Sequence, residues 1–291
     1  MSPAPPGRPL LGIVLIVVAT AFFAVLDGTA KLLAATWPPV WVAWARYTAQ
    51  GALMLAILLP IRGPRLWHTR RPGGQALRAL FLLATTVCIV TALRRMPLAE
   101  TTAVVFTAPL FVVLLSRPIL GESVGRLRWI ATGLGFAGAL IVTRPGAGLA
   151  VDGMLLAAAG ALTLALYQIM TRQMSPQEDP LAMLFWNALV GSVVLTPLLA
   201  WQGELGPLEL RSAGLVLTMG VAAGLGHFLL IRAFREAPAS LLSPVSYLQI
   251  LMAAAVGWLF FEQFPDPLSL AGMAVIILSG ALLAWQAHQA D

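Results

Sequence analysis

Charged side chains are scarce in this sequence: Asp, Glu, Lys and Arg make up 10% of its 291 residues, against about 25% in an average soluble domain. Cysteine and lysine each occur once, as Cys88 and Lys31, and histidine occurs three times. A single cysteine forms no internal disulfide, and no pair of histidines has the spacing of a metal motif. The sequence also lacks a glycine-rich loop ending in Lys-Ser or Lys-Thr, which would bind nucleotide phosphates. We therefore expect no metal site, no cofactor, no enzyme activity and no direct use of ATP by this chain.

Apolar sequence is abundant instead, with 59% hydrophobic residues and a mean hydropathy of +0.87. The stretch from Leu10 to Ala35 contains no charged residue except Asp27 and Lys31. About 20 apolar residues cross the hydrocarbon core, and they must be helical because lipid cannot satisfy an open backbone. The sequence thus predicts an all-α integral membrane protein with ten transmembrane helices, near residues 10–35, 38–60, 74–93, 98–117, 127–143, 152–171, 180–201, 211–233, 239–261 and 267–287.

Basic residues gather on one side of this predicted bundle. Ten spans place both termini on the same side, whose segments carry twelve Lys and Arg residues, Arg78 among them, against five on the other side. The positive-inside rule then predicts cytoplasmic termini in a multi-pass inner-membrane protein. This placement explains the net charge of +6 without nucleic acid, because the arginines lie at the ends of apolar segments rather than along one helix face.

The second half of the sequence repeats the first at a distance of 141 positions, which brings Gly12 onto Gly153 and Lys31 onto Arg172. The segment 92–97 returns as 233–238, and Gly121-Glu122 falls on Phe261-Glu262 after a slip of one residue. We predict two five-helix repeats, residues 1–147 and 148–291. Because five is odd, the second repeat must lie inverted in the bilayer, an arrangement typical of carriers with a binding site near the midplane.

Several segments resemble the drug/metabolite transporter superfamily, in its EamA-type branch of ten helices. They are residues 23–31, 38–46, 92–102, 109–122 and 133–145, together with the matching second-repeat segments between residues 233 and 262. The resemblance implies a secondary transporter that moves small metabolites by alternating access, with amino acids, aromatic ones included, as exported substrates. The first-helix pattern with Asp27 and Lys31 also looks like carriers that take up riboflavin or S-adenosylmethionine. A non-transporting membrane scaffold is the remaining alternative, and the expected partners are a small-molecule substrate and membrane lipid.

Charged and titratable residues inside the spans are the first candidates for a substrate site, because each is costly in lipid. Asp27 and Lys31 are one helical turn apart and can meet on one face, either to handle substrate or protons or to pair helices. Lys31 can also extend to the interface. Arg46 needs a partner, for which Asp27, Glu100 or a substrate carboxylate would serve. His227 suits a proton relay or a hydrogen bond to a neighbouring backbone.

Other polar and aromatic residues away from the predicted loops either line a pocket or serve packing and the interfacial belt. These residues are Trp44, Tyr47, Tyr167, Gln168, Trp186, Asn187 and Tyr247. Prolines in the fourth and ninth spans are hinge candidates, because each removes a backbone donor; they are Pro97, Pro109, Pro238 and Pro244. Glycines in the fifth and tenth spans would pack either a homodimer or the chain itself; they are Gly133, Gly135, Gly138, Gly272 and Gly280.

Overall fold

The computed structural model describes residues 8–96, 98–143, 150–201, 209–261 and 266–290, and these are helical nearly throughout. The first half contains α1 (Pro9–Ala34), α2 (Pro39–Arg62), the short 3-10 helix η1 (Gly63–Leu66), α3 (Pro72–Arg95), α4 (Leu98–Val105), α5 (Ala108–Leu120) and α6 (Arg126–Thr143). The second half contains α7 (Val151–Met174), α8 (Pro180–Leu195), the 3-10 helix η2 (Thr196–Trp201), α9 (Leu210–Glu236), α10 (Ala239–Val245), α11 (Leu248–Phe261) and α12 (Pro267–Ala290).

Local sequence signals set many of the helix ends. Proline opens α1, α2, α3, α8 and α12, a position where its missing N–H costs nothing. The side chain of Asp179 caps α8 by accepting a hydrogen bond from the backbone N–H of Leu181 at 3.0 Å. Gly121 ends α5 in the left-handed conformation, with φ of 67°, which glycine adopts without steric cost.

The twelve α-helices form ten membrane-length segments in the described part of the chain, because α4 with α5 and α10 with α11 are halves of one segment each. Seven segments are long and apolar enough by themselves to cross a membrane, and two shorter apolar stretches are α5 (Ala108–Leu120) and the Pro267–Leu282 part of α12. The outer surface carries large apolar side chains, such as Leu155, Leu210 and Leu259, each at least 67% exposed. This is the surface of a multi-pass membrane protein, and each predicted span ends within three residues of a helix end.

Two of the predicted spans are interrupted at their middle. The fourth is broken between α4 and α5 at residues 106–107, and the ninth between α10 and α11 at residues 246–247. Pro109 lies in the first turn of α5 and Pro244 in the last turn of α10, so each proline is two residues from its break. Pro238 is the residue that precedes α10, and Pro97 lies outside the described residues.

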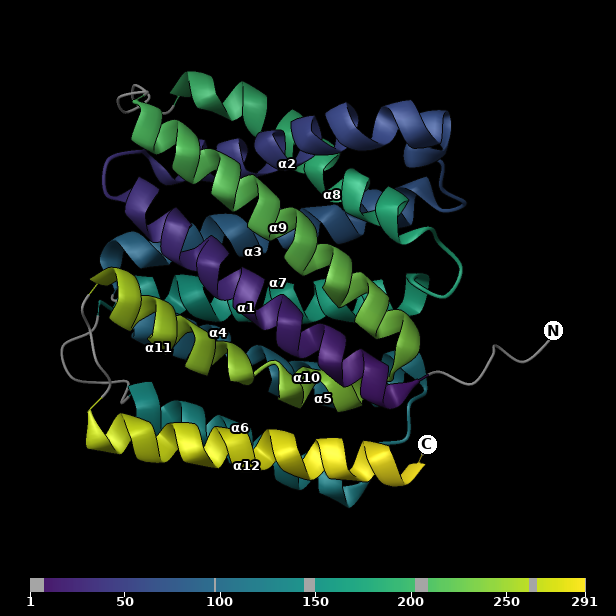
Figure 1. The fold of residues 1–291 in the computed structure, drawn as a ribbon, viewed down its shortest axis with the longest axis vertical. Helices are drawn as coiled ribbons and strands as arrows, with labels where there is room; N and C mark the ends of the chain where they lie inside the picture. The colour runs from purple at the N-terminus through teal and green to yellow at the C-terminus, as the bar shows by residue number, and fades with distance from the viewer. Residues whose placement is uncertain (1–7, 97, 144–149, 202–208, 262–265, 291) are drawn as a thin grey trace.

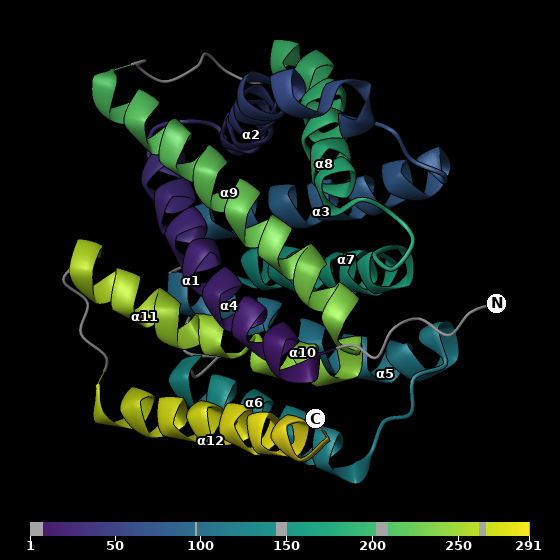
Figure 2. The same ribbon diagram turned by 45° about the vertical axis from the view of Figure 1, so that its right-hand side comes forward.

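Packing between the halves obeys a pseudo-twofold relation. In the repeat, α1 corresponds to α7 and α3 to α9, and the contact of α1 with α9 is matched by the contact of α7 with α3. The helices α2 and α8 correspond to each other and pack together, and so do α6 and α12. Figures 1 and 2 show α1 beside α9 and α6 beside α12 in both views. A Cβ on Gly12 would come within 2.7 Å of Ala237, and one on Gly153 within 2.7 Å of Met96. These two contacts exchange under the 141-residue shift, so the same close helix approach is used twice.

The two ends of the bundle are distinct. α1 begins and α12 ends at the same end (Figure 1), which we call the terminal face; the end where α1 gives way to α2 is the far face. Of the two roles considered for the glycines of the fifth and tenth spans, packing within the chain applies to Gly135 and Gly138. A Cβ on Gly135 would meet the ring of Tyr247 at 2.3 Å, and one on Gly138 would meet Ile276 at 2.7 Å.

Candidate functional site

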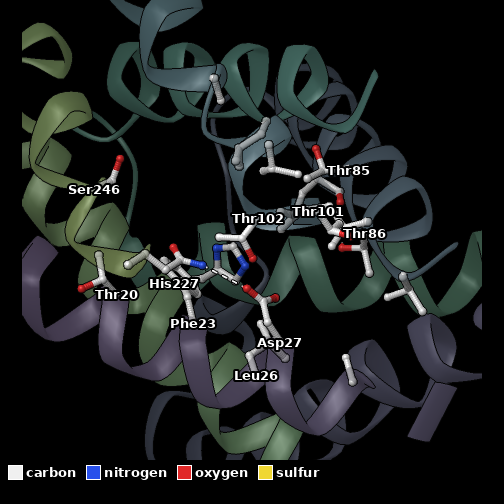
Figure 3. Close-up of a pocket in the computed structure, with 18 of the residues that line it drawn as sticks. Thr20, Phe23, Leu26, Asp27, Thr85, Thr86, Thr101, Thr102, His227 and Ser246 are labelled. Atoms are coloured by element: carbon white, nitrogen blue, oxygen red, sulfur yellow. Dashed lines mark hydrogen bonds between the residues drawn. The ribbon is translucent and has the colours of Figure 1, made fainter. Parts of the chain in front are cut away.

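A cavity of about 110 Å³ lies in the middle of the bundle, between helices of both halves. α1, α2, α3 and the α4–α5 break line it from the first half, and α7, α9 and the α10–α11 break line it from the second. Its walls are apolar except for a few charged and amide groups and a set of hydroxyls (Figure 3). The hydroxyls belong to Thr20, Thr85, Thr86, Thr101, Thr102 and Ser246. Both broken spans therefore contribute to the same cavity.

The cavity lies nearer to the far face than to the terminal face. Its lining residues Ala30, Val42 and Leu93 are two to four residues from the far ends of α1, α2 and α3. Toward the terminal face the lining stops earlier, at Leu82, ten residues into α3, and at Leu230, six residues before α9 ends. More of the bundle therefore separates the cavity from the terminal face than from the far face.

Asp27 is a carboxylate in this cavity, on α1. Its Oδ2 accepts a hydrogen bond of 3.0 Å from Nε2 of Gln249 on α11, shown as a dashed line in Figure 3. The predicted pairing of Asp27 with Lys31 is not among the ion pairs formed by the described residues, and Lys31 is not part of the cavity lining. An amide from the ninth span, rather than the neighbouring turn of its own helix, fixes the Asp27 carboxylate.

Arg46 is the cation of the cavity, on α2, and it is only 8% exposed. Its Nη1 donates to Oγ1 of Thr86 at 2.6 Å, and its Nη2 lies 2.7 Å from Nε2 of His227. Its Nε has no hydrogen-bond partner, and no acidic side chain of the described residues forms an ion pair with Arg46. Of the partners predicted for it, Asp27 shares the cavity without contact at ion-pair distance, and the side chain of Glu100 lies outside the described part.

His227, on α9, joins Arg46 to the second half of the chain. A guanidinium only donates, so Nε2 of His227 must accept from Arg46 and its proton must lie on Nδ1. Nδ1 is 3.3 Å from the hydroxyl of Tyr167, which also accepts from Nδ2 of Asn187 at 3.2 Å. His227 thus bonds two side chains rather than the neighbouring backbone, which was one of its two predicted roles, and its neutral form holds Arg46 in place.

The central network contains two repeat-related pairs of residues. The 141-residue shift maps Arg46 onto Asn187 and Thr86 onto His227, and all four take part in the same chain of hydrogen bonds. Tyr47 completes it, with its hydroxyl 2.8 Å from Oγ1 of Thr86. Sequence reasoning missed Thr86 and Gln249, although the repeat shift onto His227 marks Thr86.

Other predicted site residues divide between the cavity and the rest of the bundle. Gln168 lines the cavity. Trp44 instead donates from Nε1 to Oγ1 of Thr196 at 3.0 Å and lines a separate apolar groove, and Trp186 donates to the carbonyl of Trp67 at 3.1 Å. Tyr247 is fully buried at the α10–α11 break, where its ring packs 5.6 Å from that of Phe106 at the α4–α5 break.

One of the twelve basic residues counted on the predicted cytoplasmic side, Arg78, lies inside the bundle. It was counted with the loop arginines, but its side chain is fully buried in α3. Its guanidinium donates to Oε1 of Gln75, to Oγ1 of Thr171 and to the carbonyl of Met183, and it lies 5.3 Å from the ring centre of Tyr167. Arg78 therefore ties α3 to α7 and α8 inside the bundle.

A second polar cluster joins the halves at the terminal face, and we call it the terminal cluster. The carboxylate of Glu122, just after α5, accepts from Nε of Arg172 at 3.1 Å, from the backbone N–H groups of Ala239 and Ser240 at 3.1 Å each, and from the Ser240 hydroxyl at 2.9 Å. Arg128 donates to the same Ser240 hydroxyl at 2.7 Å. One carboxylate thus binds both α7 and the first turn of α10.

The described residues contain no group of three or more His, Cys, Asp or Glu side chains that would hold a metal ion. A many-helix membrane bundle with pseudo-twofold packing, broken spans and a charged cavity between its halves has the architecture of a secondary transporter. Comparison with known proteins agrees with this class. The model of the EamA-like transporter family matches residues 10–144 and again 151–285. The chain belongs to this family, within the drug/metabolite transporter superfamily, and is a transporter rather than an enzyme.

Named relatives carry different small molecules. The chain is 31% identical over 278 residues to a pseudopaline exporter of Pseudomonas aeruginosa, covering 92% of this chain and 94% of that protein. It is 31% identical over 226 residues to an S-adenosylmethionine uptake transporter of Rickettsia bellii, covering 76% of each. A riboflavin transporter of Vibrio cholerae is 27% identical over 285 residues, covering 96% and 95%. One crystal structure shares the fold, with a TM-score of 0.78 at 18% identity, covering 97% of this chain and 98% of the other.

Proposed function

We propose that this chain exports amino acids, aromatic ones included, or metabolites built on an amino acid, across the inner membrane. The observation that carries the proposal is Arg46, a buried cation in the central cavity whose Nε lacks a partner among the described residues. Charged groups in a membrane are normally paired, and a substrate carboxylate matches a guanidinium in geometry and charge. Asp27, across the same cavity, would receive the amino group.

The mechanism we propose is alternating access, in which repeats 1–147 and 148–291 rock about the cavity. The interrupted spans favour it, since α4–α5 and α10–α11 each bend at a break that lines the cavity. Pro109 and Pro244 flank these breaks and are the hinge residues we propose. The distribution of Lys and Arg supports a cytoplasmic location for the terminal face, with both termini inside.

Uptake of S-adenosylmethionine or riboflavin is the second candidate, and it is favoured by the relatives that carry those names. S-adenosylmethionine contains an amino acid group and fits the charges of the cavity, whereas riboflavin has neither a carboxylate nor an ammonium group. A homodimer would have to use surfaces other than Gly135 and Gly138, which pack within the chain. Light scattering of the protein in detergent tests for it.

The experiment is uptake of labelled solutes into liposomes that contain the purified protein. The panel holds amino acids, S-adenosylmethionine and riboflavin, each with and without a proton gradient, and protein-free liposomes are the blank. Saturable amino acid flux that Arg46→Ala removes supports the proposal. Flux of riboflavin alone replaces it with the uptake function, and an intact protein that moves none of the panel restores the scaffold.

A further inference from the structure

The geometry of the cavity points to a site with two charged poles for an α-amino carboxylate: Arg46, the positive pole, binds the substrate carboxylate, and Asp27, the negative pole, binds its ammonium group. This inference rests on the proposed function and names the substrate groups that are recognised. We propose that a molecule must carry both charges to bind well. Each pole is held in place by a neutral partner from the other half of the chain.

The positive pole is prepared for an anion. His227 and Thr86 each accept one hydrogen bond from the terminal nitrogens of Arg46, which leaves Nε–H and one further N–H on each terminal nitrogen. Both partners are neutral, because His227 must accept at Nε2. The guanidinium is therefore fixed in orientation, while no acidic side chain of the described residues lies within ion-pair distance of it.

The negative pole is prepared in the same manner. Gln249 donates to Oδ2 of Asp27 at 3.0 Å, and an amide neutralises no charge. A carboxylate has about four acceptor sites, so an ammonium group can be bound in addition. Arg46 and Asp27 come from the first half, and His227 and Gln249 from the second, so each pole is held across the boundary between the repeats.

The two poles together select a zwitterion. A monocarboxylate without an amino group would pair with Arg46 but leave Asp27 unpaired and near a second negative charge. An amine without a carboxylate would leave Arg46 unpaired. A missing partner for a buried charged group weakens binding by about 10- to 100-fold. The remaining walls include Phe23, Phe106 and Leu26, which suit an apolar substrate side chain.

The test uses competition in the liposome assay, with the best-transported amino acid of the panel as the labelled tracer. The competitors are that amino acid unlabelled, its decarboxylated amine and its deaminated acid, for example phenylalanine, phenethylamine and 3-phenylpropionate. Wild type is expected to bind the amine and the acid each at least about tenfold more weakly than the amino acid. Equal competition by either analogue overturns the two-pole site while leaving amino acid transport in place.

Single variants then separate the poles. Asp27→Asn should bring the deaminated acid level with the amino acid, and Arg46→Gln should do so for the amine. Arg62→Gln removes a surface cation that pairs with Asp179 at the terminal face, and it should preserve both preferences. Exchanged or unchanged preferences in the two cavity variants contradict the assignment. Should Arg46→Gln not fold, the wild-type competition alone still decides, and absence of any amino acid flux in wild type defeats the proposed function as well.

Discussion

Replacing Glu122 by alanine should destabilise the bundle more than any loss of an exposed ion pair. In wild type the Glu122 carboxylate accepts four hydrogen bonds from Arg172, Ala239 and Ser240. The side chains of Glu122 and Arg172 are only 11% and 23% exposed. Removing one partner of a fully buried ion pair costs about 3–5 kcal/mol, because it leaves the other charge unpaired; this pair is partly exposed, so we expect a loss of about 2–3 kcal/mol. The first N–H groups of α10 lose their acceptor at the same time.

The assay is thermal unfolding of purified variants in detergent, with Arg62→Ala as the matched control. Arg62 pairs with Asp179 at 2.9 Å, but these side chains are 44% and 35% exposed, so that variant should cost at most about 1 kcal/mol. A double variant with Arg172→Ala should lose less than the sum of the single variants, because the two residues stabilise each other. A Glu122→Ala protein that melts no lower than Arg62→Ala refutes the stabilising role of the terminal cluster.

The same substitution should also change access to the cavity, because the terminal cluster joins the halves at the terminal face. A cysteine at Leu230, on the terminal side of the cavity, in a Cys88→Ser background reports this access. We expect a membrane-impermeant maleimide applied from the terminal face to label it several-fold faster once Glu122 is replaced. Equal labelling rates would show that the terminal cluster stabilises the fold without closing the cavity.

Two further predictions concern the packing and the support of Arg46. Gly191→Ala should lower the free energy of unfolding by about 1–3 kcal/mol, because its Cβ would lie 2.3 Å from the buried ring of Tyr47. Gly133→Ala is the control and should melt like wild type, because there is open space around Gly133. Equal melting temperatures for the two variants would contradict the close contact. Thr86→Val keeps the shape of the side chain but removes the acceptor for Arg46, so KM should rise about tenfold in the liposome assay, and an unchanged KM would mean that Arg46 needs no such support.

Much of the fold follows from the sequence because lipid imposes a simple rule. A run of about 20 apolar residues must be a helix, so the ten segments and their ends were predicted to within three residues. The repeat shift also matched Gly12 with Gly153 and segment 92–97 with 233–238, but only the structure shows that these segments touch, Gly12 against Ala237 and Gly153 against Met96. The breaks at 106–107 and 246–247 were only suggested by prolines, because hydropathy does not change where a buried helix is interrupted.

The site was harder to predict, since its contacts join distant residues. Arg46, Asp27 and Gln168 were chosen as intramembrane polar groups and do line the cavity. The partner of Asp27, however, is Gln249, 222 residues away, and no local spacing identifies it. Arg78 shows a different limit, because its place near a helix start puts it among the basic residues of the predicted cytoplasmic side, whereas tertiary packing buries it completely.

Equilibrium binding of the transported amino acid to the purified protein, measured by titration calorimetry, tests the central claim most directly. The account predicts saturable one-site binding to wild type and to Arg62→Gln, and at least about tenfold weaker binding to Arg46→Gln. Undiminished binding to a folded Arg46→Gln protein would contradict it, because the substrate would then occupy a site other than the cavity between the two repeats.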